Sequence, residues 1–382
     1  MPAIEGITGL RPDPARVADV ASPPYDVIKP GSGIESLLKS RADSLYHVIL
    51  GDDPVKALET LQGSGALISD DEACFYVMEQ RWSGGSRLGV YAATATKPYD
   101  SGFVRRHEKT FDHKVKGRVA LTRATSLTIG PVFLLTKQPL DTVLAAVIAS
   151  EAPLYDFSSD FGGHGDLHGI ATRVWRVPVS STHGGAIAST LGDHPLYIAD
   201  GHHRYHAALL NGQSHALTYI TSGAEILGYD RVVRGTVPFA DIKDQLKLTP
   251  VDAFVTPPKH QFCLYHQGQA YLLAAQEVPD DVVGGLDCSI LERELYGKLG
   301  LSHDMIMDSA HFDYYPESEL DAMQAVVDDG SYDLAIALHP VAVDQLMAVA
   351  DAGLEDQDVV MPEKSTFFAP KILTGLVLYR HR

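Results

Sequence analysis

The sequence predicts a mixed α/β fold with two lobes, and three observations support this. Short β-rich runs alternate with segments of helical periodicity along all 382 residues. Hydrophobic residues make up 45% and charged residues 21%, a mixture typical of globular proteins. The pattern also changes after Phe239, close to a Pro-Pro pair at Pro257. We therefore expect one α/β lobe over residues 1–240 and a second over residues 241–382.

The expected strands of the first lobe are short runs rich in β-branched and aromatic residues between turn signals. They are 74–79, 88–96, 131–136, 173–177, 196–200 and 216–220. Helical spacing with an early aspartate predicts a helix over 140–150, and the Gly-rich stretch 158–169 predicts a loop. A sharp turn follows the strand at 196–200. The alanines and leucines from Ala207 then predict a helix that Asn211-Gly212 ends.

The second lobe continues with the same two kinds of segment. Residues 261–276 predict a hairpin whose turn contains His266, Gln267 and Gly268. An amphipathic helix is expected over 289–300, a strand over 332–340 and a helix over 341–353. A closing strand is expected over 372–382.

Charge and composition argue against several classes of protein. There are 31 Lys and Arg residues against 49 Asp and Glu, a net charge of −18 that repels phosphate backbones and anionic membranes. The three cysteines form no CxxC pair, so neither a disulfide framework nor a Cys-rich zinc module is expected. The N-terminus lacks a signal-peptide profile, and no apolar run reaches about 18 residues. We therefore expect a cytoplasmic protein without membrane or nucleic-acid partners.

The motifs of several common enzyme classes are missing from the sequence. Gly163-His164-Gly165 begins like a dinucleotide fingerprint, but His168 stands at the third glycine position. The sequence contains neither a Walker A motif nor a GxSxG elbow. Dehydrogenase and α/β-hydrolase functions are therefore not expected. His164, Asp166 and His168 could form a metal patch, although the stretch also reads as a loop.

The segment from Asp200 to Arg204 is the first candidate site. A turn from strand to helix points backbone N–H groups at one place, and the helix dipole favours an anion there. Arg204 could hold a phosphate through two hydrogen bonds, while His202 and His203 could donate to phosphate or bind metal. The simpler alternative is that Asp200 only caps the helix and that the histidines lie at the surface.

The second candidate is the charged segment 105–110, which continues to Asp112, Lys114 and Arg118. Glu108 could ligate Mg²⁺ or accept a proton, and the neighbouring cations could hold phosphates. A solvated charged turn would give the same pattern.

Two further segments are candidate parts of a site: one carries hydroxyl groups beside a lysine, and the other is stiffened by prolines. In 361–371, Lys364, Ser365 and Thr366 resemble the end of a P-loop without its glycines, and they could contact phosphate. In 22–28, adjacent prolines make a stiff segment that would hold Tyr25 and Asp26. Both segments are also compatible with ordinary turns.

The order of these segments is similar to that of the bacterial and archaeal domain-of-unknown-function 1015 family. SPPYDVI, HEKT, LYIADGHHR and MPEKSTFFAPK carry the resemblance, which runs from about residue 3 to residue 379. Two positions depart from the family pattern. Residues 114–118 read Lys-Val-Lys-Gly-Arg where relatives have Lys-Glu-x-Asp-Arg, and Asp230-Arg231 stands where they tend to have His-Arg.

The DGHHR turn itself resembles that of the ParB and sulfiredoxin superfamily, whose members bind nucleotide phosphates at this turn. The resemblance implies a ParB/sulfiredoxin-like nucleotide-binding core with insertions in residues 1–240. His202 stands where sulfiredoxin needs a cysteine, and no segment reads as the basic helix-turn-helix of ParB. The free-serine kinases of the superfamily need only a nucleotide, Mg²⁺, carboxylates and a small hydroxyl substrate.

These resemblances imply a nucleotide-dependent phosphotransferase, with ATP or ADP and Mg²⁺ as cofactors and a small hydroxyl compound such as free L-serine as acceptor. The residues expected to hold the phosphates are Gly201, His202, His203, Arg204, Lys364, Ser365 and Thr366. The residues expected to act in catalysis are Asp200, Glu108 and His203. Glu108 and Asp200 are also the expected Mg²⁺ ligands.

Two other functions fit the same residues. A nucleotide-binding switch would use the phosphate site without catalysis. A metal-dependent hydrolase would use His107, Glu108, His202 and His203. The sequence leaves the oligomeric state and the phosphate donor open.

Overall fold

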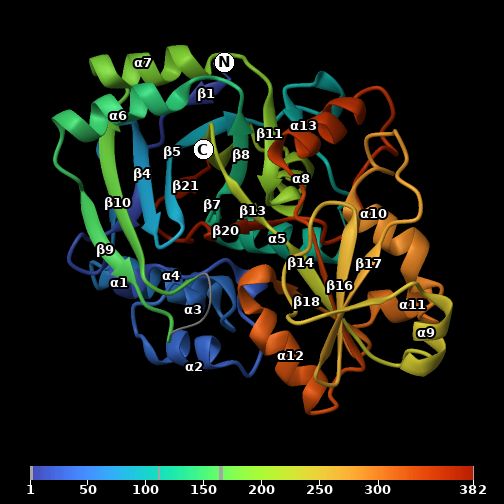
Figure 1. Ribbon diagram of the computed structural model, residues 1–382. Helices are drawn as coiled ribbons and strands as arrows, with labels where there is room; N and C mark the ends of the chain where they lie inside the picture. Colours follow the sequence, from blue (N-terminus) through green and yellow to red (C-terminus); the bar gives the residue numbers. More distant parts are fainter. Residues whose placement is uncertain (1–2, 111, 163–166, 382) are drawn as a thin grey trace. The chain divides into compact units, whose positions relative to one another are not determined.

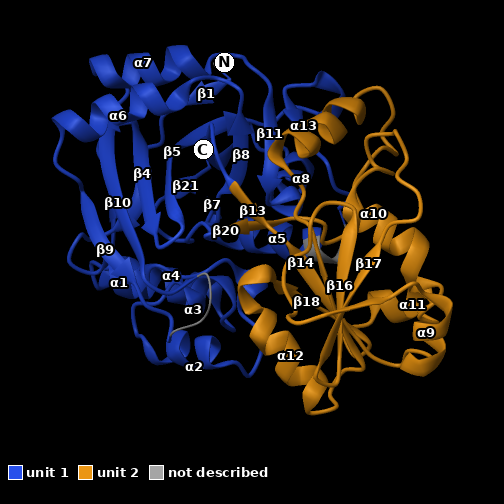
Figure 2. Ribbon diagram, in the orientation of Figure 1, with its two compact units in different colours: residues 1–224, 370–382 blue, residues 225–369 orange. Residues whose placement is uncertain are grey.

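The computed structural model describes residues 3–110, 112–162 and 167–381, so His164 and Asp166 of the expected loop lie outside the described residues (Figure 1). The chain forms two compact units, coloured separately in Figure 2. Unit 1 comprises Met1–Ala224 and Pro370–Arg382, and unit 2 comprises Glu225–Ala369. Each unit combines helices with β-sheet, which confirms the mixed α/β class.

The main sheet of unit 1 has the strand order β6-β11-β8-β12-β5-β4-β10-β9, and β1 pairs with β5. These strands are β1 (Ile4–Glu5), β4 (Cys74–Trp82), β5 (Gly85–Ala95), β6 (Val104–Arg105), β8 (Val132–Thr136), β9 (Tyr155–Ser159), β10 (Ile170–Pro178), β11 (Leu196–Asp200) and β12 (His215–Thr221). All six strands expected in this part of the chain are present, because each is a short apolar run between turn residues.

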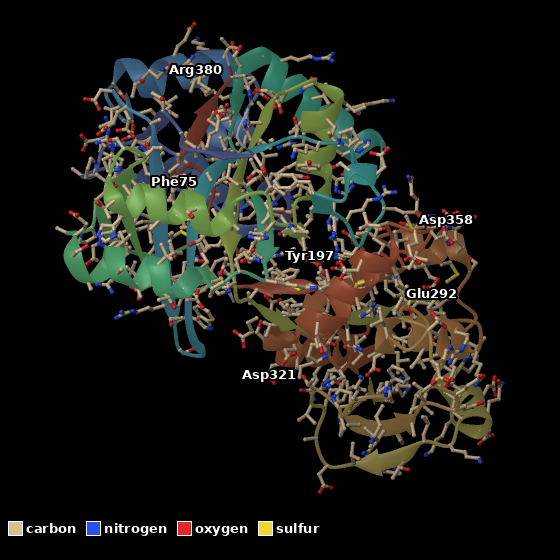
Figure 3. The ribbon with its side chains drawn as sticks, turned by 90° about the horizontal axis from the view of Figure 1, so that it is seen from above. Phe75, Tyr197, Glu292, Asp321, Asp358 and Arg380 are labelled. Carbon is tan, nitrogen blue, oxygen red and sulfur yellow. The ribbon has the colours of Figure 1, made fainter. Side chains whose placement is uncertain are left out.

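Strand β11 is central to the argument because it carries Asp200. It runs parallel to β6 and antiparallel to β8, with a register shift between Ile198 and Asp200. Tyr197, labelled in Figure 3, helps to tie β6 to β11: the Arg105 guanidinium lies 5.4 Å from its ring centre and donates to its hydroxyl. This pairing brings the segment that follows β6 alongside the end of β11.

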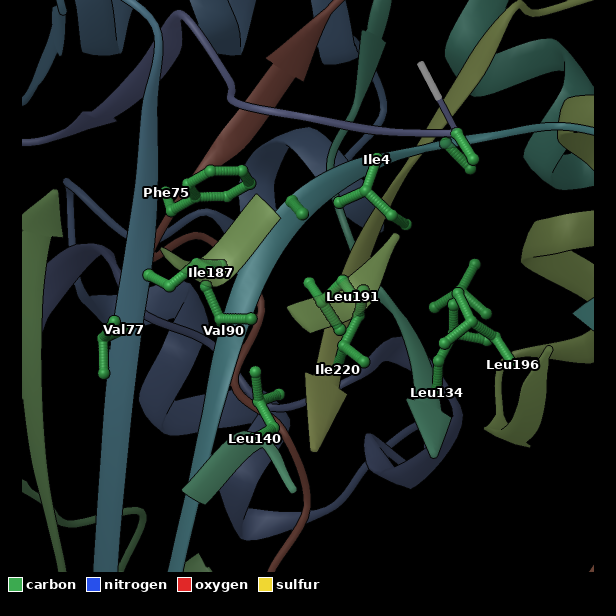
Figure 4. Close-up of a cluster of buried hydrophobic side chains, with 14 of the residues drawn as sticks. Ile4, Phe75, Val77, Val90, Leu134, Leu140, Ile187, Leu191, Leu196 and Ile220 are labelled. Carbon is green, nitrogen blue, oxygen red and sulfur yellow. The ribbon is translucent and has the colours of Figure 1, made fainter. Parts of the chain in front are cut away.

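The helices of unit 1 are α1 (Val17–Val20), α2 (Gly33–Ser40), α3 (Tyr46–Ile49), α4 (Pro54–Gly63), α5 (Asp112–Thr125), α6 (Leu140–Ser150), α7 (Thr182–Leu191) and α8 (His202–Leu210). Helices α6 and α7 lie side by side over one part of the sheet (Figure 1). Leu140 of α6 and Ile187 of α7 pack with the sheet residues Phe75, Val90 and Ile220 in one apolar core (Figure 4). Burial of this core stabilises the sheet that carries β11.

A second, smaller sheet of unit 1 has the order β3-β2-β21-β7. Its strands are β2 (Gly9–Pro12), β3 (Leu67–Ser69), β7 (Leu127–Thr128) and β21 (Leu378–Arg380). The closing strand is thus shorter than the expected 372–382. Gly375 adopts a φ of 96°, which an extended strand does not allow, and the chain there makes only an isolated bridge between Ser22 and Thr374.

The sheet of unit 2 is entirely antiparallel, with the order β15-β17-β16-β19-β14-β18. Its strands are β14 (Tyr229–Val233), β15 (Thr249–Val251), β16 (Gln261–His266), β17 (Gln269–Ala274), β18 (Phe312–Pro316) and β19 (Leu334–Leu338). The expected hairpin is β16–β17, and Gln267 and Gly268 both adopt positive φ in its turn. A separate pair joins β13 (Glu225–Leu227) to β20 (Phe367–Ala369).

The helices of unit 2 are α9 (Phe239–Gln245), α10 (Asp287–Leu291), α11 (His303–Met307), α12 (Leu320–Asp328) and α13 (Val343–Ala352). Helix α12 packs on β16, β18 and β19 and shares their apolar core. The helix expected over 289–300 is interrupted, because α10 passes into a π-helical turn over Glu292–Tyr296. The helix expected over 341–353 is present as α13.

The division into domains at residue 240 stays a prediction. The compact units themselves divide after residue 224, because β13 and β14 pair only with strands of unit 2. In residues 3–110, 112–162 and 167–381, no helix combines the length and apolar character needed to cross a lipid bilayer.

Candidate functional site

The chain turns sharply between β11 and α8, at Gly201. Its φ of 97° belongs to the left-handed region, and a Cβ atom there would lie 2.9 Å from Nε of Arg204. A glycine is therefore required on both counts. The helix starts at His202, directly after the turn as expected, because the carbonyl of Gly201 accepts from the N–H groups of Arg204 and Tyr205.

Two cations face the carboxylate of Asp200. Nη2 of Arg204 lies 3.2 Å from Oδ1, and Nζ of Lys371 lies 3.4 Å from Oδ2. The three side chains are mostly buried, with 22% exposure for Asp200 and 11% for each cation. Burial by itself would raise the pKa of Asp200, but Lys371 and Arg204 outweigh it and hold the pKa below its usual value. Asp200 is therefore a carboxylate at neutral pH.

The backbone on either side of Lys371 is held by buried polar side chains from β4 and β5. Arg87 donates to the carbonyl of Pro370 at 2.5 Å and to Oε1 of Gln80 at 2.6 Å. Gln80 in turn donates to the carbonyl of Lys371 at 3.3 Å. These bonds fix the main chain from which the Lys371 side chain reaches Asp200.

A second group of side chains lies beside Asp200 and comes from the segment after β6. The His107 and His202 rings meet edge to face with their centres 4.5 Å apart, and the backbone N–H of His107 donates to Nε2 of His202 at 3.4 Å. Nδ1 of His202 lies 3.4 Å from Oε2 of Glu108. Burial lowers the pKa of His107 to about 4 and the pKa of His202 well below its usual value. His202 is thus neutral, with its proton on Nδ1 facing Glu108.

The Pro-Pro segment of residues 22–28 also lies next to this corner. The bridge between Ser22 and Thr374 consists of two backbone hydrogen bonds, of 3.0 and 2.8 Å. It holds Tyr25, over whose ring the Arg118 guanidinium of α5 stacks at 3.9 Å. The pKa of Tyr25 is raised by burial and by Asp26, and Arg204, Arg118 and Asp200 also act on it electrostatically.

Lys364, Ser365 and Thr366 belong to unit 2. Lys364 adopts a φ of 59°, a strained conformation for a residue with a side chain, and its Nζ lies 3.4 Å from the hydroxyl of Tyr229. Ser365 is buried and donates to the carbonyl of Pro362 at 2.6 Å, so its hydroxyl bonds within its own loop. Their contact with phosphate stays a prediction.

The Asp230-Arg231 pair, where relatives tend to have His-Arg, is fully buried in β14. Oδ1 of Asp230 accepts from the Leu338 N–H at 3.0 Å, whereas Oδ2 is buried with no hydrogen-bond partner. Burial raises the pKa of Asp230 to about 7. Arg231 donates to the hydroxyl of Tyr296 at 3.0 Å and to the carbonyl of Tyr229.

Sequence reasoning missed three residues that the structure places at the corner. Lys371 and Tyr25 stood inside the quoted segments, and Arg118 stood among the quoted cations, but none was chosen as a site residue. Their proximity to Asp200 and Arg204 comes from chain segments that are far apart in sequence, so no local signal could reveal it.

The donor set at the corner is sparse for a transition metal. No group of three or more His, Cys, Asp or Glu side chains suited to holding a metal occurs among the described residues. Mg²⁺ commonly binds through one or two carboxylates together with substrate phosphates, so it needs fewer protein ligands. Both oxygens of Asp200 face cations, and Glu108 therefore fits Mg²⁺ better than Asp200 does.

Comparisons with known proteins place the chain in a family. Free serine kinase in complex with AMP is similar with a TM-score of 0.38 and 12% identity, over 75% of this chain and 92% of that one. A conserved hypothetical protein from Pyrococcus furiosus gives a TM-score of 0.35 and 12% identity, over 74% and 92%. A C-terminally truncated SbnI from Staphylococcus aureus gives 0.39 and 10%, over 75% and 86%.

None of the curated proteins matches the chain in sequence. One family model does match, over residues 4–289, which includes the β11 strand, the GHHR turn and the Asp230-Arg231 pair. The chain therefore belongs to the family described as "Protein of unknown function (DUF1015)".

Proposed function

We propose that this protein is a nucleotide-dependent phosphotransferase that acts on a small hydroxyl compound. One observation carries the proposal: Arg204 and Lys371 contact Asp200, and His107 and His202 lie close enough to interact with it electrostatically, at the point where a strand ends and a helix begins. Glu108 joins this group through its contact with His202. Because phosphoryl transfer depends mainly on positioning and charge neutralisation, such a cationic corner suits the chemistry.

The cations are the proposed phosphate ligands. Asp200 aligns Arg204 and Lys371, which bring two positive charges to one place in a protein of net charge −18. The backbone of Gly201 and the first turn of α8, which includes His202 and His203, add the positive end of a helix dipole. Lys364 and Thr366 remain proposed contributors from unit 2.

Glu108 is the proposed general base. Asp200 is a weak base because its two cations lower its pKa, and both ring nitrogens of His202 lie at hydrogen-bonding distance from partners. In the proposed step, the acceptor oxygen forms a bond to the terminal phosphorus and the bond from that phosphorus to the nucleotide breaks. The hydroxyl proton passes to Glu108. Mg²⁺, held by the nucleotide phosphates, would neutralise charge on the transferring group.

The proposed donor is ATP or ADP, and free L-serine is the first acceptor to test. The choice of L-serine rests on the resemblance of the DGHHR turn to that of the free-serine kinases. The contacts at Asp200 support a phosphate ligand and do not select an acceptor.

A thermal-shift screen of ATP, ADP, AMP and CTP with and without Mg²⁺ tests the phosphate site. A nucleotide that binds only the folded state raises the melting temperature. Product formation from L-serine is then followed by ³¹P NMR. The Arg204→Ala variant should lower turnover by about 10²–10³-fold, as loss of a preorganised charge partner does. The control is Arg123→Ala, which removes an exposed arginine bonded to Asn211 beyond the other end of α8.

The outcomes separate the alternatives. Equal turnover of Arg204→Ala and the parent protein would remove Arg204 from the mechanism. Saturable nucleotide binding without product from any alcohol would favour the nucleotide-binding switch. A flat screen for every nucleotide would contradict both functions.

A further inference from the structure

Within the described part of the chain, the guanidinium of Arg118 lacks the carboxylate partner that several other arginines of unit 1 possess. Arg11 pairs with Asp70 at 2.8 Å and Arg173 with Glu79, each through a carboxylate. Arg118 stacks on the Tyr25 ring but has neither a hydrogen bond nor an ion pair with any side chain that the structure describes. Burial lowers the pKa of Arg118 and the nearby Arg204 lowers it further, whereas Tyr25 and Asp26 act in the opposite direction without forming a hydrogen bond or an ion pair with it.

Arg118 lines a pocket in unit 1 between α5 and α8. Its empty volume, open solvent at the mouth included, is about 550 Å³. The two helices run in the same direction here, since Arg118 and Arg204 line the pocket together and Arg123 bonds Asn211 further along both helices. Apolar side chains such as Leu121 and Ala208 form much of the wall.

The polar side chains of the pocket also retain unused hydrogen-bonding capacity. The hydroxyls of Tyr25, Thr122 and Thr374 line it, and within the described ranges none of them has a hydrogen-bond partner. The pocket therefore presents one unpaired guanidinium and three hydroxyls beside a short apolar wall. These groups are therefore available to a polar ligand that enters the pocket.

We propose that this pocket binds the acceptor, a small hydroxy or amino acid, and that Arg118 holds its carboxylate; the assignment of this ligand as the acceptor rests on the proposed function. The fork of a guanidinium matches a carboxylate in two parallel hydrogen bonds, and the single charge of Arg118 matches a monoanion. Leu121 and Ala208 suit a short carbon chain, and the three hydroxyls suit its hydroxyl or amino group. Arg204, which borders both this pocket and Asp200, places that chain next to the proposed phosphate site.

An oxyanion in the pocket could belong to the acceptor or to the nucleotide, and calorimetry on the full chain distinguishes the two. The probes are L-serine, D-glycerate, serinol (which carries a hydroxymethyl group in place of the carboxylate) and ADP, each titrated alone. We expect both acids to bind the parent protein. Arg118→Met should weaken them about 10–100-fold, the effect of one charge-assisted pair. The weak binding of serinol and the affinity for ADP should change less than about twofold.

Three further variants keep the test independent of folding. Thr122→Met retains Arg118 but fills the pocket, and it should weaken both acids by at least about tenfold. Lys116→Met removes an exposed charge two residues from Arg118 on the same helix and should leave every affinity unchanged. Arg118→Lys should restore part of the acid affinity, because it restores the charge without the fork.

The proposal is overturned if neither acid binds the parent protein, if Arg118→Met binds the acids as the parent does, or if it loses ADP and keeps the acids. The last outcome would assign the pocket to the nucleotide. None of these titrations needs turnover. Acid binding through Arg118 with no phosphorylated product would therefore leave the acid site standing and contradict the phosphotransferase.

Discussion

Asp200 in unit 1 and Asp230 in unit 2 are both removed from bulk water, yet their acidities move in opposite directions. Two cations approach Asp200, one at each oxygen, and lower its pKa. Asp230 receives a single backbone N–H at Oδ1 and nothing at Oδ2, and burial raises its pKa to about 7. Arg231 is adjacent in sequence, but its guanidinium donates to the hydroxyl of Tyr296 and to the carbonyl of Tyr229. Burial alone therefore does not decide the charge of a carboxyl group; the groups aimed at its oxygens do.

The largest expected effect is at Asp230. Its folded pKa of about 7 lies above the ordinary value of 3.8, so the folded protein binds the extra proton between these two pH values. The stabilising contribution is complete below about pH 4 and is lost as pH rises through 7. At 1.36 kcal/mol per pKa unit, the free energy of unfolding falls by about 4 kcal/mol across this window. Asp230→Asn should abolish this dependence.

Urea unfolding of both proteins between pH 4.5 and 8, in steps of about half a unit, measures the difference between them. A constant difference in the free energy of unfolding across that range would show that Asp230 is ionised throughout. The contrast between Asp200 and Asp230 would then be wrong.

The next effect is at Asp200, with the opposite sign. Its folded pKa is depressed, so its contribution is present at neutral pH and is lost as pH falls below about 4. Asp200→Asn leaves Arg204 and Lys371 without their shared anion and should lower the free energy of unfolding at pH 7 by about 3 kcal/mol. The control Asp193→Asn changes an exposed aspartate in the turn before β11 and should stay within about 0.5 kcal/mol. Similar losses in both variants would mean that the ion pairs contribute nothing measurable.

His107 extends the comparison from buried carboxyl groups to a buried basic side chain. Burial lowers its pKa to about 4, so it stays neutral in the fold while the unfolded chain takes up a proton below about pH 6.5. Its contribution is present above pH 6.5 and is lost as pH falls to 4, by about 3 kcal/mol. His107→Phe should remove this acid sensitivity, which unfolding curves of the two proteins at pH 7 and pH 4.5 would reveal. Parallel pH profiles would place His107 in water instead.

The smallest effect concerns the backbone at Gly201. Alanine there must adopt the left-handed region and brings a Cβ atom to 2.9 Å from Nε of Arg204. Gly201→Ala should cost about 1–2 kcal/mol of unfolding free energy. Gly63→Ala, at the end of α4 with no atom within 4 Å of the new Cβ, should be neutral or stabilising by up to about 1 kcal/mol. Equal melting temperatures for the two variants would show that the turn relaxes.

Local patterns predicted six strands of the main sheet of unit 1 (β4, β5, β8, β10, β11 and β12), the β16–β17 hairpin and the turn after Asp200, because apolar runs and turn residues act over a few positions. They also placed the N-terminus of α8 at the turn after Asp200, where the structure has it. They missed short strands such as β6 and β9. The contact of Lys371 with Asp200 joins residues 171 positions apart, so no local sequence pattern at either residue predicts it. The resemblance of four segments to those of a known family grouped the motifs into one candidate site. Only the fold shows that the guanidinium of Arg118 forms no ion pair with any carboxylate that the structure describes.

The chain leaves unit 1 at residue 224, builds all of unit 2, and returns at Pro370 to deliver Lys371. During synthesis, the ribosome must therefore pass residue 371 before Asp200 can meet its second cation. Until then the nascent β11 corner holds Arg204 alone, and a message cut short inside unit 2 would yield a protein whose corner never reaches its mature charge balance.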